Sequence, residues 1–116
     1  MEMKDATIAL AALGQDTRLA VFRLLVEAGP EGLAAGAIAE ALSVPPATLS
    51  FHLKELGAAG LVVAMPQGRS IRYRADFEAM DALIGFLTHN CCGGNAEACR
   101  PAVASRSGTR RKASAA

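Results

Sequence analysis

Two adjacent prolines, Pro45 and Pro46, divide the middle of the chain into two short segments with helical spacing. The residue before a proline avoids the α region, whereas proline itself is tolerated in the first turn of a helix. Isoleucine and leucine recur three or four residues apart in both segments, which gives each one an apolar face. We therefore predict helices over Ala35–Leu42 and Pro46–Ala58, joined by a tight turn.

The segments on either side of this helix pair add further helices and a hairpin. From their apolar spacing, the additional helices are expected over Asp5–Leu13, Thr17–Ala28 and Asp76–Thr88. Asp16 is the expected N-cap of the second of these. Two strand-like runs, Leu61–Met65 and Ser70–Ala75, flank a turn at residues 66–69 and predict a β-hairpin. The expected fold is mainly α with a small β-hairpin, in the element order of a winged helix-turn-helix.

In a helix-turn-helix, the second helix offers its outward residues to the major groove of DNA. The residues expected to face the groove are Ala47, Thr48, Ser50, Phe51, His52 and Lys54. Hydroxyl groups can bond base edges or phosphates, and methyl groups can touch the methyl of thymine. The hairpin carries Arg69, Arg72 and Arg74. Arginines of a hairpin can contact phosphate or enter the minor groove, so we expect Arg69 and Arg72 to contact DNA as well.

The charge of the chain is distributed unevenly. Its 12 basic and 11 acidic residues give a net charge of +1, but the tail after Cys99 carries five basic residues and no acidic one. Any attraction to DNA by the remainder must therefore come from local clusters. We expect a winged-helix and dimerisation domain over residues 1–90, a cysteine segment over 91–99, and a disordered basic tail over 100–116.

The run Leu-Ser-Val-Pro-Pro-Ala-Thr-Leu-Ser-Phe-His-Leu-Lys-Glu-Leu over residues 42–56 resembles the recognition helix of the ArsR/SmtB family of metal-responsive repressors. The run Leu-Gly-Gln-Asp-Thr-Arg-Leu at residues 13–19 is also similar to that family. The predicted hairpin, with Gly68, Arg69 and Tyr73, resembles the family's wing. The resemblance implies a homodimeric repressor on double-stranded operator DNA with an inverted repeat, one half-site per subunit. We expect the last helix to form the dimer face together with the first. Its candidate interface residues are Phe77, Met80, Leu83, Ile84 and Leu87.

The cysteines of the chain, Cys91, Cys92 and Cys99, all follow the last expected helix. The helix over 35–42 lacks the Cys-x-Cys pair that many family members carry there, and the C-terminal cysteines resemble those of arsenite-responsive repressors. Three thiolates suit arsenite, because As(III) is soft, takes three ligands and has a +3 charge that they neutralise. Sb(III) shares these properties. The resemblance thus implies that the metalloid binds these cysteines as inducer and releases the operator.

Other uses of the thiols stay open. With His89 as a fourth ligand, the segment would suit zinc, cadmium or lead. A disulfide between Cys92 and Cys99 would make a redox switch, whereas a vicinal bond between Cys91 and Cys92 would be strained. Incidental thiols would leave a DNA-binding regulator with another kind of ligand.

The sequence shows no signal for catalysis, export or membrane insertion. With two histidines, no Cys-x-x-Cys and no phosphate-cradling loop, it contains no catalytic constellation, and we expect no enzyme activity. No apolar run is long enough to span a bilayer, and the N-terminal stretch lacks the basic start of a signal peptide. An odd number of cysteines without an export signal favours thiols in a reducing cytoplasm.

Overall fold

The computed structural model of the protein describes residues 1–95 and 97. By its internal contacts the chain divides into two units, Met1–Phe86 and Leu87–Ala116. Cys99 and the tail over 100–116, which we expected to be disordered, lie outside the described residues. No helix in the described part of the chain is long and apolar enough to cross a bilayer.

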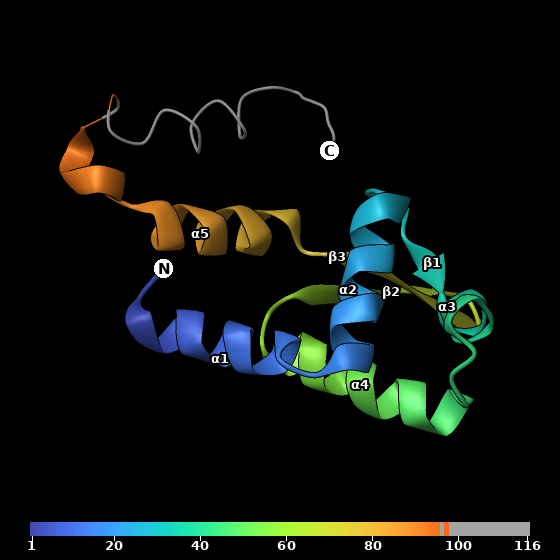
Figure 1. The fold of residues 1–116 in the computed structure, drawn as a ribbon. Helices are drawn as coiled ribbons and strands as arrows, with labels where there is room; N and C mark the ends of the chain where they lie inside the picture. Colours follow the sequence, from blue (N-terminus) through green and yellow to red (C-terminus); the bar gives the residue numbers. More distant parts are fainter. Residues whose placement is uncertain (96, 98–116) are drawn as a thin grey trace. The chain divides into compact units, whose positions relative to one another are not determined.

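The described residues form the helices and strands of a winged helix-turn-helix, as predicted (Figure 1). The helices are α1 (Met3–Leu13), α2 (Asp16–Ala28), α3 (Ala35–Leu42), α4 (Pro46–Ala58) and α5 (Phe77–Thr88). The strands are β1 (Leu33–Ala34), β2 (Val62–Gln67) and β3 (Ser70–Ala75). In the second unit, the short 3-10 segment η1 (Cys91–Gly94) follows α5. This arrangement confirms the mainly α-helical fold class with a small sheet.

The helix-turn-helix itself begins and ends at the residues that the sequence predicts. Ser43 ends α3 in the left-handed conformation, with a φ of 54°. Its backbone N–H donates to the carbonyl of Glu40, which continues the hydrogen bonding of the last turn of α3. Pro46 then occupies the first turn of α4, where its missing N–H leaves no helical hydrogen bond unmade. The two prolines therefore define the turn by local stereochemistry.

The start of α2 differs from the prediction. Asp16 is already inside the helix, and Gln15 is the N-cap. The Oε1 atom of Gln15 accepts a hydrogen bond from the backbone N–H of Arg18 at 2.8 Å. Asp16 sits instead in the first turn, where a negative charge is favourable near the exposed N–H groups of the helix.

The sheet has one strand more than the predicted hairpin. It is antiparallel in the order β1-β3-β2, with Leu33 of β1 opposite Tyr73 of β3. The pattern of the sequence predicts no strand at residues 33–34. β2 also runs to Gln67, two residues beyond its predicted end. The wing is therefore a three-stranded sheet anchored to the segment between α2 and α3.

Gly32 lets the chain enter β1 close to β3. Its φ is +66°, and a Cβ built on it would lie 2.1 Å from the carbonyl oxygen of Tyr73. A side chain at this position would both strain the backbone and overlap β3. The pairing of β1 with β3 consequently depends on a glycine at residue 32.

The core of the first unit is made of small and aliphatic side chains. Its largest fully buried residues are Leu25, Ile38, Leu49, Leu56, Leu61 and Val21. The buried residues of α1 are alanines, Ala6, Ala9 and Ala12, and Leu13 at its end packs against the core partly buried. The helix contacts α2 and α4. Three larger apolar residues of α1, Met3, Ile8 and Leu10, are exposed. The first helix therefore presents an apolar surface to solvent.

Candidate nucleic-acid interface and thiol segment

α4 has a core face and a solvent face. Leu49, Leu53 and Leu56 are buried, as expected from their spacing. The residues of α4 that were expected to face the groove and are exposed are Ala47, Thr48, Ser50, Phe51 and Lys54. The solvent face thus combines hydroxyls, a methyl, an aromatic ring and one cation, which can read base edges and hold phosphates, and it also carries the exposed carboxylate of Glu55.

His52 is the exception among the predicted groove residues, because only 7% of it is exposed. Its Nδ1 atom lies 3.4 Å from Nη1 of Arg18. A guanidinium can only donate hydrogen bonds, so Nδ1 must be the acceptor in this contact. The expectation that His52 faces the groove is therefore wrong for its side chain: a polar partner inside the subunit holds it there, and it supports α4 from behind.

Arg18 connects three helices, a role that residue type and spacing do not predict. Its Nε atom donates to the carbonyl oxygen of Ala12 at 2.7 Å, near the end of α1. Its backbone belongs to the first turn of α2, and its Nη1 reaches His52 in the middle of α4. The only feature of the sequence that drew attention to Arg18 was its place in the family-like run at residues 13–19. A single side chain thus fixes the recognition helix against the first two helices.

The wing arginines differ in their surroundings. Arg69 lies at the exposed turn between β2 and β3, where its charge can reach a ligand. Arg72 instead donates from Nε to the carbonyl of Glu31 at 3.0 Å and from Nη2 to the carbonyl of Gly32 at 2.8 Å. Arg74 is half-buried and donates to the carbonyl of Ala75 at 3.2 Å. Arg72 therefore ties β3 to the α2–β1 loop, and its expected contact with DNA stays a prediction.

A hollow of about 310 Å³ lies between α4 and the sheet. Ser50, Lys54 and Tyr73 line it together with apolar residues of α4 and β2. The hydroxyl of Ser50 and the ammonium group of Lys54 can both donate hydrogen bonds to the oxygens of a phosphate. The space between recognition helix and wing is thus suited to the backbone of a nucleic acid.

The predicted dimer residues fall into two groups. Leu83 is buried in the core of its own subunit, and Phe77 and Met80 pack against that core. Ile84 and Leu87 are exposed. The stripe on α5 therefore also covers the core of its own subunit, and the expected place of Leu83 in a dimer interface stays a prediction. Of this stripe, Ile84 and Leu87 are the residues that present an apolar surface.

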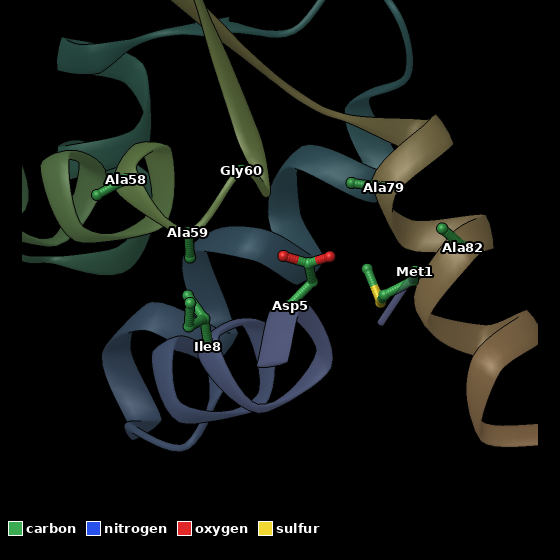
Figure 2. A pocket seen from close by; sticks show the side chains of 8 residues that line it. All are labelled: Met1, Asp5, Ile8, Ala58, Ala59, Gly60, Ala79 and Ala82. Atoms are coloured by element: carbon green, nitrogen blue, oxygen red, sulfur yellow. The ribbon is translucent and has the colours of Figure 1, made fainter. Parts of the chain in front are cut away.

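A second hollow, of about 370 Å³, lies between α1, the end of α4 and the start of α5 (Figure 2). Its lining is mostly alanine and glycine, with Asp5 as its one charged side chain. The carboxylate of Asp5 also accepts a hydrogen bond from the backbone N–H of Glu2 at 3.3 Å, which supports the first turn of α1. One carboxylate among apolar groups does not make a metal site, so this hollow is not a candidate inducer site.

The thiol segment belongs to the second unit. Cys91 and Cys92 are exposed, and their sulfur atoms lie 3.8 Å apart. Cys92 has a left-handed backbone with a φ of 55°, and Gly93 and Gly94 continue with positive φ values. Among residues 1–95 and 97, no three His, Cys, Asp or Glu side chains are gathered so that they could hold a metal ion. The structure thus brings two of the three predicted ligands together, and the third is Cys99, outside the described residues.

Comparison with known proteins places the fold in a known class. A family model for a helix-turn-helix domain matches residues 13–63. No curated protein matches the sequence. Among solved structures, an ArsR-like transcriptional regulator from Rhodococcus sp. RHA1 is 26% identical with a TM-score of 0.67, over 91% of this chain and 95% of that one.

Two other solved structures are similar over most of their length. The homodimeric winged helix-turn-helix DNA-binding domain of a possible ArsR-family regulator from Mycobacterium bovis is 27% identical, covers 80% of this chain and 86% of that one, and has a TM-score of 0.60. The antimony-specific transcriptional repressor AntR is 25% identical, covers 81% and 85%, and also has a TM-score of 0.60. Together, the fold, the matched helix-turn-helix domain and these neighbours identify the chain as a winged helix-turn-helix DNA-binding transcriptional regulator that is similar to regulators of the ArsR family.

Proposed function

We propose that the protein is a homodimeric repressor that releases its operator when trivalent arsenic or antimony binds the thiolates of Cys91, Cys92 and Cys99. The proposal joins two parts of the chain that the structure describes separately. The first unit supplies the recognition helix and the wing, and the second supplies the exposed thiols. Trivalent arsenic and antimony are soft ions that favour thiolate sulfur.

The separation of the two vicinal sulfurs carries this proposal. Two thiolates that share one ion, with bonds of about 2.3 Å at angles of about 95–110°, lie about 3.4–3.8 Å apart. The sulfur atoms of Cys91 and Cys92 lie 3.8 Å apart, at the upper end of that range. Both thiols are exposed, so an ion can reach them without opening the core. The pair is therefore close to the geometry of two ligands on a single ion.

The backbone after the pair supports the participation of Cys99. Gly93 and Gly94 have φ values of +64° and +87°, and the N–H of Asn95 donates to the carbonyl of Cys92 at 3.1 Å. This turn reverses the chain directly after the two thiols. A third thiolate seven residues beyond Cys92 is within reach of the same ion by chain length alone. The antimony-specific function named for the neighbour AntR supports the same class of inducer.

The exposed apolar residues of the first and last helices support a homodimer. Met3, Ile8 and Leu10 of α1 and Ile84 of α5 are exposed large apolar side chains, which a second copy would cover. The similar domain from Mycobacterium bovis is homodimeric. Because a twofold dimer carries two identical recognition helices, we propose an operator with an inverted repeat.

The test is a titration of reduced, full-length protein and its operator with arsenite and, separately, with antimonite. The operator is first obtained by selecting bound sequences from a randomised duplex library. We expect either ion to weaken DNA binding by about 5–150-fold, the usual range of coupling between two sites. Cys92→Ser should retain the DNA affinity and lose the response, because two ligands remain for a three-ligand ion.

His89→Gln is the matched control, since it alters the same segment without removing a thiol. It should respond to arsenite as the wild type does. Normal release by arsenite from Cys92→Ser would contradict the proposed thiolate site. If zinc alone releases the operator from the wild type and His89→Gln abolishes this release, the segment would instead be a four-ligand zinc site.

The contribution of the basic groups to DNA binding can be tested independently of the inducer. Lys54→Ala and Arg69→Ala should each weaken operator binding about 3–10-fold. Each should also reduce the slope of log affinity against log salt concentration by roughly one, since each removes one phosphate partner. Arg23→Ala is the control, because Arg23 lies on α2 and pairs with Glu27 at 3.3 Å on the surface. Fluorescence anisotropy at several salt concentrations measures these effects. Equal losses in all three variants would show a general charge effect and exclude a local interface.

A further inference from the structure

Phe51 is the one large apolar side chain of α4 that is exposed, with 56% of its surface accessible. Its neighbours at helical spacing on the same outward row are Ala47 and Lys54, both also exposed. The opposite side of the helix carries Leu49, Leu53 and Leu56 in the core. Phe51 therefore points away from the subunit, in the direction in which the recognition helix meets its ligand.

The surroundings of Phe51 argue against a protein-binding patch. The other exposed large apolar residues of the described chain lie on α1 or just before it, or on α2, β3 and α5. On α4 the ring is bordered instead by the exposed polar and charged side chains of Thr48, Lys54 and Glu55. A single exposed ring among polar side chains and charges of both signs does not form the contiguous apolar area that marks a protein interface.

The ring is also held in place. Its centroid lies 5.6 Å from that of His52, with an interplanar angle of 62°, so the two rings meet edge to face. His52 is buried and contacts Arg18. The exposed ring thus rests on a neighbour that is fixed to the interior, which lowers the entropy that Phe51 would lose on contacting a ligand.

The major groove offers one apolar group to such a ring. Among the base edges exposed there, adenine, guanine and cytosine present hydrogen-bond donors and acceptors, and thymine adds its C5 methyl. Phenylalanine has no group with which to bond the polar edges. We propose that Phe51 is a specificity-determining residue that selects thymine in each operator half-site through contact with this methyl group.

This inference rests on the proposed binding of operator DNA and is independent of the inducer. The variant Phe51→Ala removes the ring from a solvent-exposed position, so the protein should fold normally. Leu19→Ala is the matched control, because Leu19 is a similarly exposed apolar residue on α2, at 45%. Wild type and both variants are first used to select sequences from the same randomised duplex library.

The decisive measurement replaces thymine by deoxyuridine, one position at a time, in one half-site of the selected operator. This exchange removes the methyl group and leaves every hydrogen-bonding group in place. At one position the wild type and Leu19→Ala should lose about fourfold in affinity, the usual effect of one buried methyl group. Phe51→Ala should bind the thymine and deoxyuridine operators equally well.

The outcomes separate this inference from the proposed function. If the wild type selects a sequence, but no thymine in it is sensitive to deoxyuridine or the sensitivity persists in Phe51→Ala, the role of Phe51 is overturned while operator binding stands. If the wild type selects no sequence at all, operator recognition itself is overturned, and this inference falls with it.

Discussion

Replacing Gly32 with alanine is expected to lower the free energy of unfolding by about 2–4 kcal/mol. A left-handed backbone costs a residue with a side chain roughly 1–2 kcal/mol. The added Cβ would lie 2.1 Å from the carbonyl oxygen of Tyr73, so β1 and β3 must also move apart. The overlap is with the backbone of a strand and not with a flexible side chain that could move aside, so it adds to the loss of stability.

Thermal or urea unfolding of full-length protein measures this effect. For a domain of this size, each kcal/mol corresponds to about 4–8 °C in Tm. Gly36→Ala is the control, because a Cβ at Gly36 of α3 would have no neighbour within 4 Å. This control should be neutral or slightly stabilising, since alanine favours helix over glycine. Equal stability of the two variants would show that β1 does not depend on Gly32.

The second large effect is expected at Arg18. Arg18→Leu should lower the free energy of unfolding by about 2–3 kcal/mol, because it removes the donor to the Ala12 carbonyl and the donor to buried His52. Operator affinity should fall further than unfolding alone explains, since α4 loses the link that fixes it to α1 and α2. We expect about a tenfold loss under conditions in which the variant is fully folded, or roughly 1.4 kcal/mol of binding free energy.

His52 provides the matched pair of variants for this test. His52→Asn places an amide oxygen near the position of Nδ1 and can still accept from Arg18, so it should retain most of the affinity. His52→Leu has a similar volume and no acceptor, and it should resemble Arg18→Leu. Operator titrations are compared with circular dichroism at the same temperature. If His52→Leu binds as tightly as His52→Asn, the contact with Arg18 does not position the recognition helix.

The parts of the fold that the sequence predicted are those that short-range chemistry determines. The boundaries of α3 and α4 follow from apolar spacing and from the two prolines, all within one stretch of chain. β1 escaped prediction because a two-residue strand has no periodicity of its own. It exists through its pairing with Tyr73 and Arg72, about forty residues further along the chain. The N-cap at Gln15 was missed because Asp16 is the better cap by residue type alone.

The candidate site could be predicted in outline and not in detail. Residue type and spacing placed Thr48, Ser50 and Lys54 on the exposed face of α4. They could not show that His52 is buried, because its polar partner Arg18 lies on another helix. Similarly, Arg72 is engaged by backbone carbonyls of a loop whose position depends on the tertiary fold. The closeness of Cys91 and Cys92 follows from their adjacency in the sequence. The participation of Cys99 is a prediction that the titration with arsenite tests.

The small size of the fully buried side chains of α1 links the folding of this protein to its abundance. Ala6, Ala9 and Ala12 each bury little apolar area, so α1 adheres to its own subunit less strongly than a helix with a leucine stripe would. Its larger residues, Met3, Ile8 and Leu10, would gain most of their burial from a second copy. If the protein forms the proposed dimer, association stabilises the folded helix by mass action. With the proposed dimer, a cell that holds little of this protein would hold a less stable one, and synthesis of more protein would stabilise the molecules already present.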